Sequence, residues 1–112
     1  MRCDFRGEKV PIAAEIPANE KERLQALSNY CVLDTPPEQG FDRITSLAAT
    51  IFQAPIALVS LVDRDRQWFK SRVGLDAAET HRDLAFCAHA ILNSSVFYIH
   101  DATKDPRFCD SP

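Results

Sequence analysis

One heptapeptide, residues 56–62, constrains the fold more than any other stretch of the chain. Its sequence, IALVSLV, is apolar at both odd and even positions apart from Ser60. Because successive side chains of a strand point to opposite faces, this pattern predicts a strand in the middle of a sheet, covered on both faces. A helix at these positions, or a strand bare to water at a sheet edge, would overturn the fold and the function inferred below.

Length and charge narrow the classes that the chain can belong to. Its 112 residues suit one domain, and 46% hydrophobic with 26% charged residues is the balance of a globular protein. This composition excludes a disordered chain, a collagen and a coiled coil. The net charge is -3 and no basic stripe is present, so we expect no nucleic-acid partner.

The cysteines are far apart in the sequence and form no C-x-x-C pair, which excludes a zinc knuckle and a dithiol redox motif. They are Cys3, Cys31, Cys87 and Cys109. No apolar run follows the positive charges near the amino terminus, so we expect a cytoplasmic protein with reduced thiols.

Residues 44–62 carry no charged side chain and approach the length that spans a bilayer. Polar residues dilute the run, and Pro55 divides it into a part with helical spacing and a part with strand character. We therefore predict a core helix followed by a core strand, with no membrane span in this segment.

Periodicity predicts three helices after a tail or linker at residues 1–18. The first begins at Asn19, whose side chain caps it together with Glu22, and ends before Leu33. The second covers about 38–52, and the third begins at an Asp83 cap and reaches residue 91. The second helix should face the core with one apolar stripe, made of Phe41, Ile44, Ala48, Ile51 and Phe52.

Three strands are predicted at 56–62, 67–73 and 96–100, with a hairpin turn at 63–66 and a polar connection at 75–82. The strand at 67–73 alternates and should be half exposed. Turn residues fill 101–106, before Phe108. These elements supply too little cover for the strand at 56–62, so we expect the fold to be incomplete at its C-terminal end.

Six blocks of sequence, in this order, carry a family resemblance: NEKERL (19–24), LDTPPE (33–38), PIALVSLVD (55–63), DRQWFKS (65–71), FCAHAIL (86–92) and DATKDPRF (101–108). Together they resemble the GAF domains of bacterial signalling proteins over residues 19–112. The resemblance implies an α+β fold with a central antiparallel sheet. Helices would pack on one face, and a ligand pocket would lie on the other face beneath a helix and loop layer. The family's C-terminal strands and closing helix are missing from this chain.

On the family pattern the segments 86–89 and 101–108 line the ligand pocket. The candidate ligand-binding residues are Phe86, Cys87, His89, Asp101 and Phe108. The alternative is that Phe108, with Phe86 or Cys87, simply fills the core.

The sequence argues against metal binding, bilin attachment and methionine sulfoxide reduction. His81, Cys87 and His89 are spaced H-x5-C-x-H, but residues two apart on a helix point in different directions, so we expect no metal. Cys87 could attach a bilin, as in the phytochrome branch, yet there the cysteine directly precedes histidine, whereas Ala88 intervenes here. A free methionine sulfoxide reductase activity would need reactive thiols, and Cys31 and Cys87 fall on apolar helix faces where a thiol tends to be inert.

Trp68, Lys70 and Arg72 could stack and pair with an anionic ligand such as a nucleotide. The simpler interpretation, a solvated strand face, is preferred. Four acids are interpreted as turn and capping residues rather than as an acid–base pair: Asp63, Asp65, Asp101 and Asp105.

The leading functional hypothesis is a non-catalytic sensory module that binds a small molecule and biases an attached output domain. The resemblance implies a histidine kinase or a diguanylate cyclase as that output. The rival hypothesis is an interaction module whose amphipathic helices pair in a homodimer without any ligand.

Overall fold

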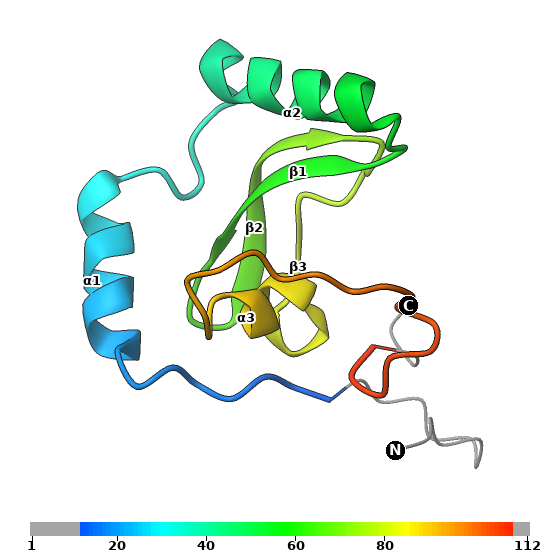
Figure 1. Cartoon of the computed structure of the whole chain (residues 1–112). Coiled ribbons are helices and arrows are strands. Elements are labelled where there is room, and N and C mark those ends of the chain that lie inside the picture. The colour runs from blue at the N-terminus through cyan, green and yellow to red at the C-terminus, as the bar shows by residue number, and fades with distance from the viewer. Residues whose placement is uncertain (1–11, 109–112) are drawn as a thin grey trace.

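A computed structural model describes residues 12–108 and shows an α+β fold (Figure 1). Its elements in chain order are α1 (Glu20–Tyr30), α2 (Gln39–Phe52), β1 (Ala57–Val62), β2 (Arg66–Val73), β3 (Glu79–His81), a 3-10 helix η1 (Arg82–Leu84) and α3 (Phe86–Ala90). The three strands form one antiparallel sheet in the order β1-β2-β3. Within residues 12–108, no helix is long and apolar enough to cross a membrane.

The strand predicted at 56–62 forms, but it lies at an edge of the described sheet and not in its middle. Helix α2 packs against one face of β1, and α3 contacts the strand through Cys87 and Ser60. Its side chains are half-buried except for Val62, which is buried. The apolar pattern therefore predicted correctly that other elements pack on both faces of this strand. The mid-sheet position inferred from the pattern was wrong, because a strand can be covered on both faces without a hydrogen-bonded neighbour at both edges.

The middle strand is β2, and it is the best buried element of the chain. Its residues 67–71 are all buried, which corrects the prediction of a half-exposed strand. The predicted turn closes the hairpin, since the backbone N–H of Asp63 donates to the carbonyl of Arg66 at 2.8 Å. Strand β3 pairs with the first part of β2 and was missed from the sequence, because its three residues Glu79–His81 are polar.

A β-bulge interrupts the hairpin where Val59 pairs with Ser71 and Ser60 pairs with Phe69. Lys70 is the extra residue on β2. Bulges re-aim side chains, and here Lys70 and Ser71 both contact α2 or the loop that precedes it. The strict alternation assumed for this strand fails at this point.

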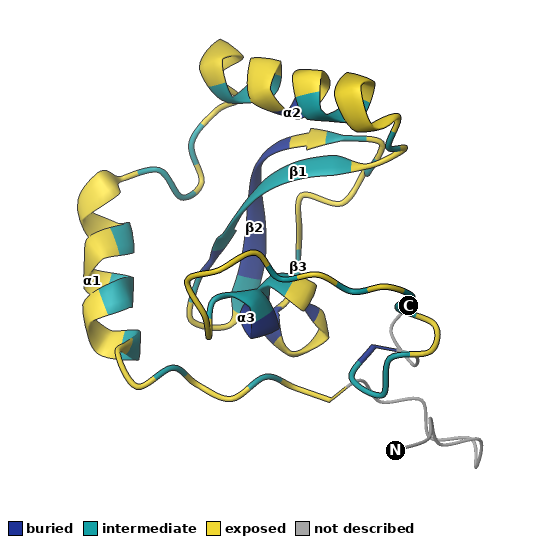
Figure 2. Ribbon diagram, in the orientation of Figure 1, coloured by how far each residue is buried: buried dark blue, intermediate teal, exposed yellow. Residues whose placement is uncertain are grey.

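Helix α2 matches its predicted bounds, but only Phe41 and Ala48 of its predicted core stripe are partly buried. Its one buried residue is Thr45, 2% exposed, whose hydroxyl lies 2.8 Å from that of Ser71. Ile44, Ile51 and Phe52 of the predicted core stripe are exposed (Figure 2). A polar residue can occupy the contact because its hydrogen bonds are satisfied there.

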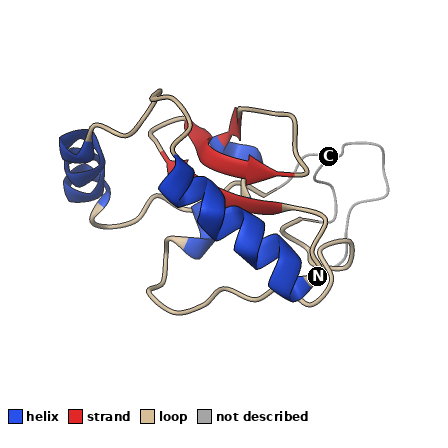
Figure 3. Cartoon of the chain, turned by 90° about the horizontal axis from the view of Figure 1, so that it is seen from above, coloured by secondary structure: helices blue, strands red, loops and turns tan. Residues whose placement is uncertain are grey.

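Helix α1 stands to one side of the sheet and does not pair with α2 (Figures 1 and 3). None of its residues is buried. The predicted Asn19 cap is wrong: the Asn19 side chain makes no capping bond, and its carbonyl instead accepts from the N–H of Arg23 at 2.9 Å. Of the helices that the resemblance implies on one face of the sheet, α2 packs there and α1 does not.

Gly74 ends β2 with a positive φ of 79°, which glycine adopts without steric cost. The backbone of Pro55 passes so close that a Cβ at this position would lie 1.9 Å from the Pro55 carbonyl oxygen. This contact closes the end of the hairpin against the segment that follows α2.

After β3, the structure differs from two predictions, the Asp83 cap of α3 and the strand at residues 96–100. Asp83 lies inside η1 and does not cap α3, which begins after Ala85 without a side-chain cap. Residues 96–100 form no strand, and Val96 is 93% exposed. These aromatic and β-branched residues predicted a strand, but no strand among residues 12–108 pairs with them.

Candidate functional site

The segment that carries most of the predicted ligand residues covers the sheet face opposite α2. Helix α3 is short, and Ala85 and Ala88 are buried at its start and middle. Small side chains at these positions let the helix approach the sheet closely. The thiol of Cys87 lies 3.1 Å from the hydroxyl of Ser60 on β1.

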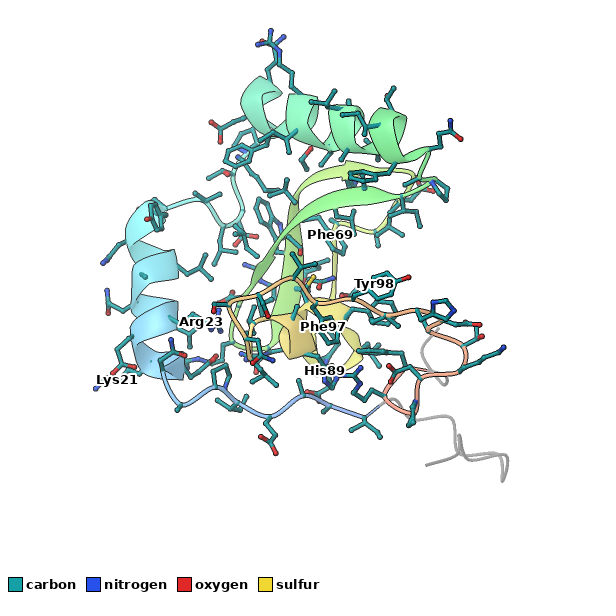
Figure 4. The ribbon with its side chains drawn as sticks, in the orientation of Figure 1. Lys21, Arg23, Phe69, His89, Phe97 and Tyr98 are labelled. Atoms are coloured by element: carbon teal, nitrogen blue, oxygen red, sulfur yellow. The ribbon has the colours of Figure 1, made fainter. Side chains whose placement is uncertain are left out.

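An aromatic cluster forms where α3 meets the C-terminal segment. Phe108 is 3% exposed, and its ring centroid lies 4.3 Å from that of Phe86 and 4.9 Å from that of His89. Phe97 contacts Phe108 edge-on at 6.2 Å. Figure 4 shows Phe97 beside α3 with His89 close by. We call Phe86, His89, Phe97 and Phe108 the aromatic cluster.

Arg107 and Asp105 close one side of this cluster. The Arg107 guanidinium lies 5.0 Å from the Phe97 ring centroid and 5.1 Å from that of Phe108, within the range of cation–π attraction. Asp105 accepts from Arg107 at 2.8 Å, and this bond lowers the pKa of Asp105 to about 2. The pair thus stays ionised at neutral pH and holds the guanidinium over the rings.

His89 joins the two ends of the described chain. Its Nε2 lies 3.0 Å from the carbonyl oxygen of Ile12, and the Ile12 N–H donates to the carbonyl of Arg107 at 3.3 Å. The segment before α1 and the segment after α3 are therefore side by side at the aromatic cluster.

The structure brings Phe86, His89 and Phe108 together but places Asp101 apart from them. Asp101 accepts from the backbone N–H and the hydroxyl of Thr103, which is the local bonding of a turn residue. Phe97 belongs to the cluster and was missed, because residues 96–100 were interpreted as a strand. The signal available in the sequence was that Phe97 is an aromatic residue close to Phe108 along the chain.

The three residues spaced H-x5-C-x-H each contact another part of the protein. The Nδ1 of His81 accepts from the backbone N–H of Asp83, while Cys87 and His89 have the partners given above. Across residues 12–108, no group of three or more His, Cys, Asp or Glu side chains is arranged to hold a metal ion.

A second polar site, between α2 and β2, was not anticipated from the sequence. Lys70 has a fully buried side chain whose Nζ contacts Thr35 Oγ1 at 2.6 Å, the Pro36 carbonyl at 2.7 Å and Glu38 Oε2 at 2.6 Å. Ser71 donates to Asp42 at 2.5 Å. The solvated face that we preferred for Trp68, Lys70 and Arg72 is therefore wrong for Trp68 and Lys70, which are buried.

These residues border a cavity of about 500 Å³ on the α2 side of the sheet. Its lining includes Thr45, Trp68, Lys70, Ser71 and Arg72. Because the Lys70 ammonium already has three acceptors, this arrangement anchors the loop before α2 to the central strand.

Part of a known signalling enzyme is similar to this chain. A cyclic di-GMP phosphodiesterase of Pseudomonas aeruginosa is 43% identical to this chain over 96 residues. The matched region makes up 86% of this chain and 16% of the phosphodiesterase, so the chain spans about a sixth of that relative's length. No protein-family model matches the sequence.

Proposed function

We propose that this chain is a regulatory sensory module of a cyclic di-GMP signalling protein. The observation that carries the proposal is the 43% identity with a region that forms 16% of a cyclic di-GMP phosphodiesterase. A segment of that size has the length of a single domain within a larger enzyme. The resemblance to GAF domains supports a sensory role for this segment. The proposed output is then a phosphodiesterase in place of the kinase or cyclase expected from the sequence.

The α3 face of the sheet is the proposed ligand site. Phe86 is partly exposed at the edge of the aromatic cluster, and His89 offers a polar group beside the Phe108 ring. A ligand here would contact α3 and both end segments of the described chain together, because His89 and Arg107 bond to Ile12. A ligand that binds one arrangement of these segments more tightly than another would shift the conformational equilibrium of an output domain attached to them.

A thermal-shift series on the purified chain tests the ligand role. The panel is cyclic di-GMP, cyclic AMP, cyclic GMP and biliverdin. A ligand present at a hundred times its Kd stabilises by about 2.7 kcal/mol, which raises the Tm of a domain of this size by roughly 10 °C. Phe86→Ala should abolish the shift, while Tyr98→Ala, at an exposed position on the neighbouring segment, should keep it.

A flat response in the wild-type chain to every compound of the panel would count against the ligand role. An equal shift in the Phe86→Ala variant would place the ligand elsewhere than the aromatic cluster. Absorbance of the purified chain after expression with a bilin supply reports separately on attachment at Cys87.

A homodimerisation module is the second candidate, and the outer side of α2 favours it. Ile44, Leu47 and Ile51 follow one another at i, i+3 and i+7 and are all exposed. Residues 46–53 carry no charge, so two copies related by a twofold axis could meet there without burying one. Sedimentation equilibrium tests this function: Leu47→Lys should yield a monomer and Ala26→Lys on α1 should not. A monomeric wild-type chain at all concentrations would exclude it.

A further inference from the structure

A second cavity, of about 440 Å³, lies between α1 and the turn that joins β1 to β2. Leu24 and Leu27 of α1 line it together with Val32 and Leu33 of the following loop. Polar residues make up the other half of the lining: Ser28, Cys31, and Asp63 and Arg64 of the turn. Its volume falls within the range of small-molecule sites.

Polar contacts, rather than apolar packing, hold α1 over this cavity. At its first turn Arg23 donates to the carbonyl of Val62, and Glu20 accepts from Arg82 at 2.6 Å. After the helix, Asp34 accepts from Arg66 at 2.7 Å. The apolar side of α1 therefore spans a space that no side chain of the described residues fills, with Leu24 and Leu27 only half-buried.

Among the described residues that line the cavity, Arg64 is a cation without a counter-ion. Asp63 is paired with Arg66 at 3.2 Å, and Arg66 also binds Asp34 and Glu79. The guanidinium of Arg64 has no ion pair within residues 12–108. A cavity lined by leucine and valine side chains on one side and by Arg64 on the other suits a molecule with an apolar body and an anionic head.

We propose that this cavity binds an amphiphilic carboxylate of the fatty-acid class. The aliphatic chain lies against Leu24, Leu27 and Leu33, where apolar burial provides the driving force. The carboxylate accepts charge-assisted hydrogen bonds from Arg64. Bound in this way, the ligand fills the space beneath α1 and fixes the helix against the turn. The site needs neither an output domain nor the aromatic cluster.

Isothermal titration of the whole chain with octanoate, decanoate and dodecanoate, below their micelle-forming concentrations, tests the proposal. Each added methylene should tighten binding roughly fourfold until the cavity is filled. Arg64→Gln should weaken decanoate binding roughly tenfold and leave decanol binding unchanged, because only the carboxylate uses the guanidinium. Arg43→Gln, an exposed arginine of α2 without an ion pair in the described part of the chain, is the matched control and should change neither.

Cys31 supplies an independent readout because it follows α1, is exposed and lines the cavity. In a variant whose other three cysteines are replaced by serine, decanoate should slow the reaction of the Cys31 thiol with a disulfide reagent at least threefold, in proportion to occupancy. Decanoate affinity unchanged by Arg64→Gln, affinity independent of chain length, or full Cys31 reactivity at saturation would each overturn the proposal.

Discussion

The carboxylate of Glu20 accepts two hydrogen bonds from the guanidinium of Arg82, at 2.6 and 3.2 Å. This contact joins the first turn of α1 to η1, 62 residues later in the chain. Arg82 is buried, and Glu20 supplies its counter-charge. The position of α1 beside the sheet thus depends on an ion pair.

The ion pair makes stability depend on pH in the acid range. Hydrogen bonds from Arg82, and then from Arg23, lower the pKa of Glu20 from 4.5 to about 2. Because this folded-state pKa is depressed, the stabilisation is complete above pH 4.5 and is lost as the pH falls towards 2. Glu20→Gln should therefore lower the free energy of unfolding by about 2 kcal/mol at pH 7, and the difference should vanish near pH 2. Urea titrations across this range measure it.

Glu22→Gln is the matched control for that experiment, since Glu22 is an exposed acid on the same turn of α1 without a salt bridge in the described residues. It should change stability by less than about 0.5 kcal/mol at any pH. An equal loss in both variants would show that helix charge, rather than the Arg82 contact, is responsible.

The second prediction concerns Lys70 and Glu38. The lysine side chain is fully buried, whereas the glutamate side chain is 60% exposed. Glu38→Gln should cost about 1–2 kcal/mol, because it leaves the buried ammonium without a counter-charge. The same change made in a Lys70→Met background should cost little, since the charge is already gone. A double-mutant cycle measures this coupling, and additive losses would show that the two groups do not interact.

Two glycines provide a matched pair for backbone conformation. Gly74→Ala should destabilise the chain by about 2 kcal/mol or more, because φ is positive and the Cβ would collide with the Pro55 carbonyl. Gly40→Ala lies within α2 with open space around it and should stabilise by about 0.5–1 kcal/mol. Thermal melts of both variants test these opposite signs; a stable Gly74→Ala variant would contradict the close approach.

The aromatic cluster gives a fourth prediction. Phe108→Ala removes a buried ring that touches three others, and it should cost about 3–4 kcal/mol. Val96→Ala, at a side chain that is 93% exposed, should cost less than about 0.5 kcal/mol. Urea unfolding distinguishes the two. A small loss for Phe108→Ala would mean that the C-terminal segment does not pack on α3.

The sequence predicted α2, β1 and β2 to within one residue at each end, since their apolar periods extend over many positions. It failed where a pattern was short or polar. Strand β3 has three polar residues, and residues 96–100 have strand-like side chains but no neighbouring strand in the described sheet. Strand order also escaped prediction, because an apolar run reports burial and not hydrogen-bond partners.

The candidate site could be predicted only in part. The family resemblance indicated that Phe86, His89 and Phe108 would line a ligand pocket, and the three side chains do meet. The network around Lys70 could not be inferred, since it depends on a bulge that turns a lysine inward from a strand with alternating polarity. The ties between α1 and the sheet join residues far apart in sequence, for which no local signal exists.

The most direct test of the sensory role replaces the matching region of the Pseudomonas aeruginosa phosphodiesterase with this chain and measures cyclic di-GMP hydrolysis. Deletion of that region should change the hydrolysis rate roughly fivefold or more, because coupling between two sites commonly has this magnitude. The chimera should restore the rate of the parent enzyme. A chimera that hydrolyses cyclic di-GMP at the rate of the deletion variant, although folded, would contradict a regulatory role for this chain.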